Sequence, residues 1–260
     1  YGIVDVDGAA ITVTLTGSVA TSALTITDGT LSCGANTVTA AGVTVGDGAG
    51  AAASAVLNAG TGGVTTSAGL SVNATDGDYN PGASGTLTFS GAGNWAGPAA
   101  DNYGTVVINS NGVSPQNALV TGQLTVNGTF TLTLGAGNNL SAAGIVGAGA
   151  LVATGATVTT SAGLTITGFT AGTSLTFSGT GNWSGTGPFG AVSVTGGTVT
   201  LTSSVPTSAL AITNGTLSCG ANTVTAAGVT IGDGVGAAGS AVLNAGTGGV
   251  TTSAGLSVNA

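Results

Sequence analysis

No lysine, arginine, histidine or methionine occurs in this sequence, and all eight acidic residues are aspartate. Without histidine or lysine the usual general bases are missing, and neither a Ser-His-Asp nor a Cys-His arrangement can be built from the chain. Without lysine or arginine there is no phosphate clamp and no basic patch, which argues against binding of nucleic acid. We therefore expect a protein that is not an enzyme and that requires no cofactor.

Charged residues are scarce, at 3% of the chain against about 25% in an ordinary soluble domain. No apolar run reaches the roughly 18 residues that a membrane helix needs, so we expect no membrane insertion. The chain is nonetheless 42% hydrophobic, whereas disordered chains combine low hydrophobicity with high charge. We therefore expect the chain to fold.

One long segment occurs twice. Residues 203–260 repeat residues 17–74 almost letter for letter, and self-similarity at a long period is the signature of a repeat architecture. Because the second copy stops in the middle of a unit, we expect the chain to be a piece of a longer repetitive polypeptide. We expect residues 1–260 to form a single continuous solenoid with internal units at about 1–102, 103–188 and 189–260.

Short runs of alternating β-branched and small polar residues predict strands throughout the chain. Residues 1–19, 24–31 and 37–46 are examples, and the runs end at Gly, Asp-Gly or Asn, which tolerate positive φ at turns. Residues 46–63 give the weakest strand signal, but their glycines disfavour a helix as well. We therefore expect an all-β protein.

Two architectures fit strands at this spacing. The first is a parallel β-helix, or β-solenoid, in which short strands stack coil upon coil. It is favoured because a strand-turn pattern recurs within each unit, inward residues are small or β-branched, and units differ by insertions at turns. The alternative is a series of tandem β-sandwich domains. A sandwich core usually holds a large aromatic residue, and Trp95 and Trp183 could play that part.

Several stretches resemble the repeats of large bacterial surface and secreted β-solenoid proteins, of which filamentous-haemagglutinin-like adhesins and autotransporter passengers are the best known. These stretches are FGAVSVTGGTVTLTSSV (189–205), LAITNGTLSCGANTVTAAG (210–228), QLTVNGTFTLTLGAGNNLSAAG (123–144) and LTFSGTGNWSG (175–185). The resemblance covers nearly the whole chain. It implies a right-handed parallel β-helix outside the cell, with an adhesive or scaffolding role and no catalytic residues.

Resemblance and composition together favour a structural function. We expect an extracellular or cell-surface segment that associates with itself into filaments or bundles, because rods with few charges can pack side by side without large desolvation costs. An adhesin stalk or a ligand-binding surface is the alternative, with contacts from loops such as 75–85 and 96–102. A third hypothesis is ice binding by rows of threonine. The candidate rows are Thr12/Thr14/Thr16, Thr25/Thr27, Thr131/Thr133 and Thr200/Thr202.

A short acidic stretch is a candidate metal site. Asp76, Asp78 and Asn80 alternate in the sequence, and oxygen ligands at this spacing begin a calcium loop. The sixth position of such a loop is normally glycine, but here it is Pro81, and no glutamate closes the loop. A plain turn rich in Asp and Asn is therefore the alternative to a calcium site.

Two further groups of residues are candidates for covalent modification. Cys33 and Cys219 occupy the same place in the two copies, and in a solenoid they lie too far apart for one disulfide. Each is either a small buried hydrophobe or part of an inter-chain disulfide between neighbouring rods. Glycosylation sequons (Asn-x-Ser/Thr) occur at Asn73, Asn127, Asn139, Asn182 and Asn214, where a glycan would add solubility.

Overall fold

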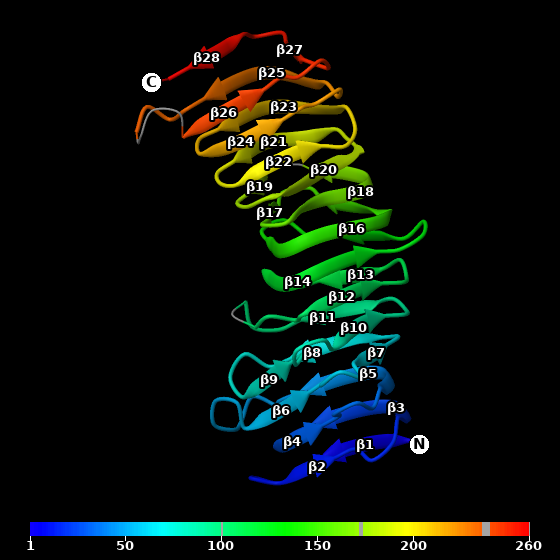
Figure 1. Ribbon diagram of the computed structural model, residues 1–260. Coiled ribbons are helices and arrows are strands. Elements are labelled where there is room, and N and C mark those ends of the chain that lie inside the picture. The colour runs from blue at the N-terminus through cyan, green and yellow to red at the C-terminus, as the bar shows by residue number, and fades with distance from the viewer. Residues whose placement is uncertain (100, 172–173, 236–239, 260) are drawn as a thin grey trace. The chain divides into compact units, whose positions relative to one another are not determined.

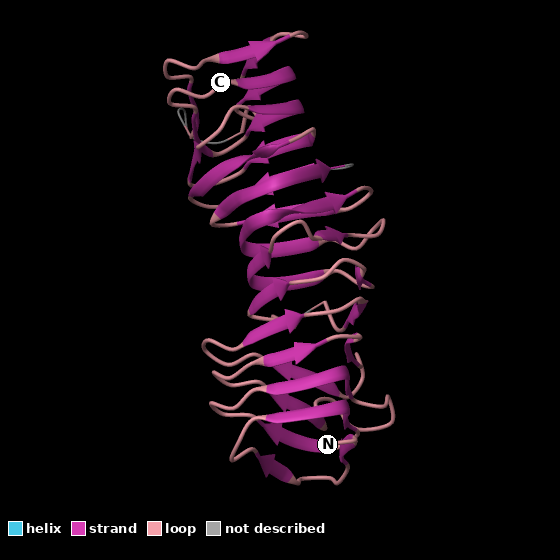
Figure 2. Ribbon diagram, turned by 90° about the vertical axis from the view of Figure 1, so that its right-hand side faces the viewer, coloured by secondary structure: helices cyan, strands magenta, loops and turns pink. Residues whose placement is uncertain are grey.

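The structure is a computed structural model that describes residues 1–99, 101–171, 174–235 and 240–259. These residues form strands, turns and loops, and none of them forms a helix. Accordingly, the described chain has no apolar helix that could cross a membrane. The strands stack in about 12 coils of a β-solenoid, a coil being one circuit of the chain (Figures 1 and 2).

Strand pairing distinguishes the two architectures that the sequence allowed. Neighbouring coils pair in parallel, for example where Leu24 lies opposite Val43 and Leu210 opposite Val229. β-Sandwiches are built from antiparallel sheets, so the tandem-sandwich alternative is wrong. The predicted all-β parallel β-helix is confirmed. The coils fall into two compact units, Tyr1–Thr133 and Leu134–Ala260.

The described residues of the first unit form fifteen strands. They are β1 (Ile3–Val6), β2 (Thr12–Thr14), β3 (Val19–Ile26), β4 (Gly29–Ser32), β5 (Val38–Val45), β6 (Ala55–Asn58), β7 (Val64–Thr66), β8 (Gly69–Val72), β9 (Gly77–Asn80), β10 (Thr86–Phe89), β11 (Gly93–Ala96), β12 (Thr105–Ile108), β13 (Val113–Pro115), β14 (Leu119–Val126) and β15 (Thr131–Thr133).

Most of these strands align in three columns, one for each side of the solenoid. The first column joins β1, the second halves of β3 and β5, β8 and β11. The second column joins the first halves of β3 and β5 with β7, β10 and β12. The third column is the separate sheet β2-β4-β6-β9. Turns between columns therefore stack along the corners of the solenoid.

Alternation of side chains explains why these sequences form coils. In β5 the side chains of Val38, Ala40, Val43 and Val45 are buried, whereas that of Thr39 is exposed. Successive residues of a strand point to opposite faces of the sheet, so the apolar residues fill the interior and the threonines face outward. The segment with the weakest strand signal also contributes a strand, β6, whose Leu57 is fully buried.

In the second unit, the part of the chain that the structure describes forms thirteen strands. They are β16 (Leu140–Ala153), β17 (Thr157–Thr160), β18 (Gly163–Ala171), β19 (Ser174–Phe177), β20 (Gly181–Thr186), β21 (Phe189–Val194), β22 (Thr198–Leu201), β23 (Val205–Ile212), β24 (Gly215–Ser218), β25 (Val224–Ile231), β26 (Ala241–Asn244), β27 (Val250–Thr252) and β28 (Leu256–Val258).

The repeated sequence folds in the same way in both units. Strands β3 to β7 of the first copy correspond residue for residue to β23 to β27 of the second, and β8 corresponds to β28 with one residue fewer. Pairing is also preserved, because Thr30 lies opposite Val56 as Thr216 lies opposite Val242. Local sequence therefore determines the coil, independently of its place in the chain.

Each unit buries a cluster of four aromatic rings with the same geometry. In the first unit the Trp95 ring lies 5.2 Å from Phe89 and 5.5 Å from Tyr103, which stacks on Tyr79 at 5.6 Å. In the second unit the same distances are 5.3, 5.3 and 5.2 Å, around Trp183. There Phe189 and Phe169 stand in place of the two tyrosines. Trp95 and Trp183, which were compatible with the core of a β-sandwich, are thus core residues of the solenoid.

Candidate functional site

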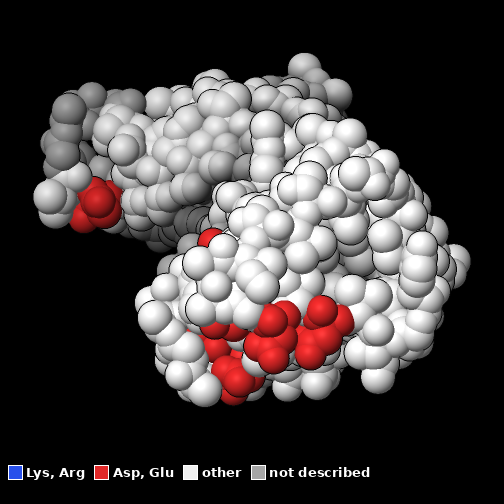
Figure 3. Space-filling view, turned by 90° about the horizontal axis from the view of Figure 1, so that it is seen from below, with Lys and Arg blue, Asp and Glu red and all other residues white. Residues whose placement is uncertain are grey.

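Aspartates line one corner of the first unit. The connections β1–β2, β3–β4, β5–β6 and β8–β9 all run from the first column to the third, and each carries one of Asp7, Asp28, Asp47 and Asp76. We call these four residues the acidic corner. Figure 3 shows most acidic side chains gathered in one group on the face in view. In the second unit the equivalent connections carry only Asp233.

Asp76 differs from its neighbours because its side chain is fully buried. One carboxylate oxygen accepts a hydrogen bond from the backbone N–H of Gly48 at 3.0 Å, and the other accepts from Asp47 and Gly48 at 3.1 Å and from Gly50 at 3.4 Å. Consecutive backbone N–H groups in such a turn form an anion-binding concavity. The backbone of the turn formed by residues 46–50 therefore binds the Asp76 carboxylate.

Two opposing effects act on the acidity of Asp76. Burial acts to raise the pKa of its carboxyl, but the hydrogen bonds from the backbone of Gly48, Asp47 and Gly50 lower it, and the net shift is downward. Hydrogen bonds to the charged form favour ionisation. Asp76 is consequently held as a carboxylate that joins two successive coils.

The predicted calcium ligands are not gathered into one cluster. The Asp76 carboxylate faces the turn of residues 46–50, while Asp78 and Asn80 are alternate residues of β9. Within the described ranges, no group of three or more Asp, Glu, Cys or His side chains is placed to hold a metal ion. Calcium binding stays a prediction. Sequence spacing alone could not show that Asp76 is engaged by residues 26 to 29 positions away.

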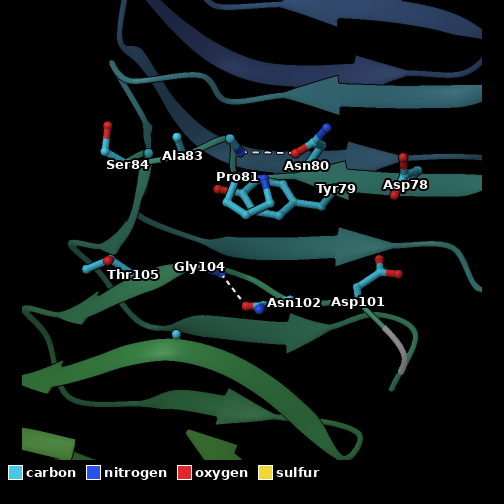
Figure 4. Close-up of a pocket in the computed structure, with 13 residues that line it drawn as sticks. Asp78, Tyr79, Asn80, Pro81, Ala83, Ser84, Asp101, Asn102, Gly104 and Thr105 are labelled. Atoms are coloured by element: carbon cyan, nitrogen blue, oxygen red, sulfur yellow. Dashed lines mark hydrogen bonds between the residues drawn. The ribbon is translucent and has the colours of Figure 1, made fainter. Parts of the chain in front are cut away.

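A groove of about 620 Å³ lies beside β9 (Figure 4). One side is formed by residues 78–85 and the other by Asp101, Asn102, Gly104 and Thr105. These segments overlap the loops 75–85 and 96–102 that the sequence analysis singled out as a ligand-binding surface. The side chains of Asn80 and Asn102 accept hydrogen bonds from the N–H groups of Gly82 and Gly104, which fixes both rims.

Asp101 is the titratable residue of this groove that sequence reasoning missed. Burial, and to a smaller extent the charge of Asp78, raise the pKa of the Asp101 carboxyl, although the backbone N–H of Tyr79 donates to it. Its Oδ2 atom is buried and has no hydrogen-bond partner in the part of the chain that the structure describes. Asp101 therefore brings to the wall of the groove a carboxyl group with a raised pKa and one buried, unpaired oxygen.

Both cysteines are free and fully buried. Burial raises the pKa of the Cys33 thiol to about 11 and also raises that of Cys219. This placement agrees with the interpretation of each cysteine as a small buried hydrophobe. An inter-chain disulfide, which stays untested, would require each sulfur to leave the core.

The predicted glycan acceptors differ in exposure. Asn139, Asn182 and Asn214 are exposed, whereas Asn73 and Asn127 are half-buried. The Asn127 amide donates to Asn109 at 2.7 Å. Modification stays a prediction at all five positions, and the three exposed ones are the more accessible acceptors.

In the solenoid, the predicted rows of threonine also contain other residue types. Thr12 and Thr14 lie outward on β2, but the positions stacked on them change to Thr30 and Ser32, then to Val56 and Asn58, and finally to Asp78 and Asn80. In the second unit, Thr200 is followed by Ser218 and Asn244. Ice binding stays a prediction without specific support from these rows.

Fold and sites together define a parallel β-solenoid protein with an uncharged surface apart from its aspartates. Searches against protein-family models, curated proteins and solved structures found no match to this chain. The predicted relation to bacterial adhesin repeats therefore rests on the sequence pattern.

Proposed function

We propose that this chain is a structural protein, an extracellular or cell-surface β-solenoid segment that associates side by side with other copies into filaments or bundles. The observation that carries the proposal is the composition of the outward surface. On the second column of the first unit, the stacked outward residues are Ala20, Thr39, Thr65, Thr88, Val107 and Thr125. This row is uncharged and consists of small side chains.

The row suits lateral contact for two physical reasons. Contact between uncharged sheets avoids the desolvation of ions, which costs several kcal/mol for each buried charge. Short β-branched side chains lose little conformational entropy when they are covered. Four of the eight aspartates lie at the acidic corner and none lies in this row, so the row itself carries no like-charge repulsion. We infer that copies meet through their uncharged faces and keep the acidic corner in solvent.

The proposal is tested by placing one positive charge on the row. Thr39 is exposed on β5, and Thr39→Lys should abolish or strongly reduce bundles seen by cryo-electron microscopy and association measured by analytical ultracentrifugation. The matched control is Ala49→Lys, which adds the same charge beside Asp47 on the acidic corner and should leave association intact. The proposal would be refuted if the unmodified protein were entirely monomeric at every concentration at which it is soluble.

The groove beside β9 supports a second candidate function, an adhesin-like ligand-binding surface. Its volume of about 620 Å³ falls in the range of small-molecule sites. The carboxyl groups of Asp101 and Asp78, which both line the groove, fit a neutral ligand rich in hydroxyl donors, such as a glycan. A glycan array followed by calorimetry tests this function. Asp101→Asn should weaken a genuine ligand about tenfold, while Thr39→Lys should not affect it.

A further inference from the structure

The two walls of the groove beside β9 carry the same kinds of polar group in the same order. Each wall presents a carboxyl, an amide and a hydroxyl group. These groups belong to Asp78, Asn80 and Ser84 on the wall of residues 78–85 and to Asp101, Asn102 and Thr105 on the wall of residues 101–105. Figure 4 shows the carboxyl pair at one end, the amide pair between and the hydroxyl pair at the other end. The chemical character of the groove therefore changes along its length.

The amide pair is oriented by the backbone. The side-chain oxygen of Asn80 accepts a hydrogen bond from the N–H of Gly82 at 3.0 Å, and that of Asn102 accepts one from Gly104 at 2.9 Å. Each amide also has an NH2 group with two donors, and neither NH2 group donates to another residue that the structure describes. Both asparagine side chains are exposed. The middle of the groove therefore offers donors to a ligand.

The two ends of the groove offer other groups. The carboxyl pair accepts hydrogen bonds when it is ionised, whereas a hydroxyl group can both donate and accept. The hydroxyl groups of Ser84 and Thr105 make no hydrogen bond to another described residue. A ligand that satisfies all three pairs must therefore supply donors at one end and acceptors beside them. Sugars supply both, because each carries several hydroxyl groups and ether oxygens.

The three pairs extend over more than one sugar ring. Asp78 and Asn80 are alternate residues of β9, so their Cα atoms lie about 7 Å apart. The hydroxyl pair lies beyond the amide pair (Figure 4). The groove volume of about 620 Å³ also exceeds that of one sugar ring. A single sugar therefore cannot contact all three pairs, whereas a chain of sugars can.

The second unit lacks the carboxyl pair. Counted from the paired aromatic residues, the positions of Asp78 and Asp101 are occupied there by Gly168 and Gly187. The aromatic cluster of the second unit forms nonetheless. Neither carboxyl is therefore needed to pack such a cluster, and the sequence has no lysine, arginine or histidine that could pair with them. Both carboxyls are thus available to a ligand.

We propose that the groove selects a linear, uncharged oligosaccharide of at least two sugar residues, bound lengthwise between the two walls. Its hydroxyl groups donate to the carboxyl pair, and its oxygens accept from the amide pair. The proposal rests on the ligand-binding function proposed above for the groove, and it adds which glycans fit. Anionic glycans are disfavoured, because like charges brought together in an interface repel each other.

The test is the dependence of affinity on the length of the ligand. Cello-, malto- and manno-oligosaccharides from one to four residues long are titrated into the intact chain in a calorimeter. In a series that binds, affinity should rise at least about tenfold from the monosaccharide to the trisaccharide and then level off. Equal affinities of these two would overturn the linear-ligand proposal but leave the ligand-binding function standing. Absence of binding by any glycan, on the array or in these titrations, would remove that function itself.

Thr105→Val tests whether the bound ligand reaches the hydroxyl pair. It removes one hydroxyl with little change of shape, so it should weaken binding of the trisaccharide about fivefold and reduce its advantage over the monosaccharide. Thr86→Val is the matched control, because Thr86 lies opposite Thr105 one coil earlier and does not line the groove. It should leave the affinity unchanged. An unchanged affinity in Thr105→Val, or an equal loss in both variants, would contradict lengthwise binding.

A chelator separates direct contact from contact through a metal ion. Because the proposal has sugar hydroxyl groups donate directly to the carboxyl pair, affinity should be the same in EDTA and in added calcium chloride. Loss of binding in EDTA that calcium restores would overturn the direct contact.

Discussion

Asp76 shows how one residue acquires a role that its local sequence does not reveal. Its spacing from Asp78 and Asn80 is that of a calcium loop, yet its carboxylate is bound by the backbone of the turn one coil below. A buried carboxylate needs compensation by hydrogen bonds or charge, and three N–H groups supply it here. Asp76 thus acts as a connection between coils.

We predict a specific pH dependence from Asp76. Because its pKa is lowered in the folded chain, the group stabilises the fold above the unfolded pKa of about 3.9, and this contribution is lost as the pH falls through the folded pKa. Asp76→Asn should therefore be less stable than the parent at pH 7, and the difference should disappear in strong acid. Urea denaturation from pH 7 to pH 2 measures it. A difference that stays constant with pH would contradict this role.

The aromatic cluster of the first unit contains a buried hydroxyl group, that of Tyr103. Tyr103 is fully buried, and its hydroxyl has no hydrogen-bond partner among the residues that the structure describes. A Cβ on Gly97 would collide with that hydroxyl. Phe189 occupies the equivalent position in the second unit without a hydroxyl. The hydroxyl is therefore a net cost in this packing.

We predict opposite effects for exchanging these two residues. Tyr103→Phe should raise stability by about 1 kcal/mol, because it removes an unsatisfied buried polar group. Phe189→Tyr should lower stability by about 1–3 kcal/mol for the reverse reason. Chemical denaturation of both variants provides the comparison, each serving as the control for the other. Destabilisation by Tyr103→Phe would mean that the hydroxyl has a partner in solution.

At the scale of elements, close contact between turns limits which residues can occupy them. Gly60 has a φ of 64°, and a Cβ there would collide with the backbone oxygen of Gly34 in the neighbouring coil. Gly246 and Gly220 repeat this contact in the second unit. The coil spacing of about 4.8 Å leaves no room for a side chain at such a position.

Gly60→Ala should therefore destabilise the chain by at least about 1–3 kcal/mol, the cost of a strained left-handed residue. Gly42→Ala is the matched control, since a Cβ at Gly42 would meet nothing within 4 Å. It should be neutral or stabilising by up to about 1 kcal/mol. Thermal unfolding of the two variants decides the matter, and similar melting temperatures would show that the turn relaxes at little cost.

The elements were more predictable from sequence than the sites. Alternation in stretches such as residues 37–46 marks strands directly, because inward and outward residues differ in polarity. The groove and the turn of residues 46–50 depend instead on contacts between coils, such as that of Gly48 with Asp76. The recurrence of Gly-Asp-Gly at 46–48 and 232–234 indicates a turn that is formed twice. Asp76, which the turn of residues 46–50 binds, lies outside the repeated stretch 17–74. Local patterns do not encode such partners.

At the scale of the whole molecule, charge is the property that we expect to control the proposed association. All charged side chains are aspartates, so no side chain of one copy can form an ion pair with a side chain of another. Net charge opposes association through repulsion. Acidity of the medium should therefore act as a control on assembly.

We predict that lateral association increases as the pH falls through about 4, where carboxylates as a class become protonated, and that it reverses when the pH is raised. Light scattering and electron microscopy across this range measure the effect. Added salt at neutral pH should act in the same direction by screening. Association that weakens on acidification would show that ionised aspartates make the contacts.

Because both copies of the repeated segment form the same coils, a deletion that spans from one copy to the other would keep the coil pattern intact. A deletion of residues 17–202, from the start of one copy to the start of the other, would join residue 16 directly to residue 203. Coils of the kind that β3 to β8 form would follow in unchanged order. Such a deletion therefore removes whole coils and leaves the geometry of each remaining coil unchanged.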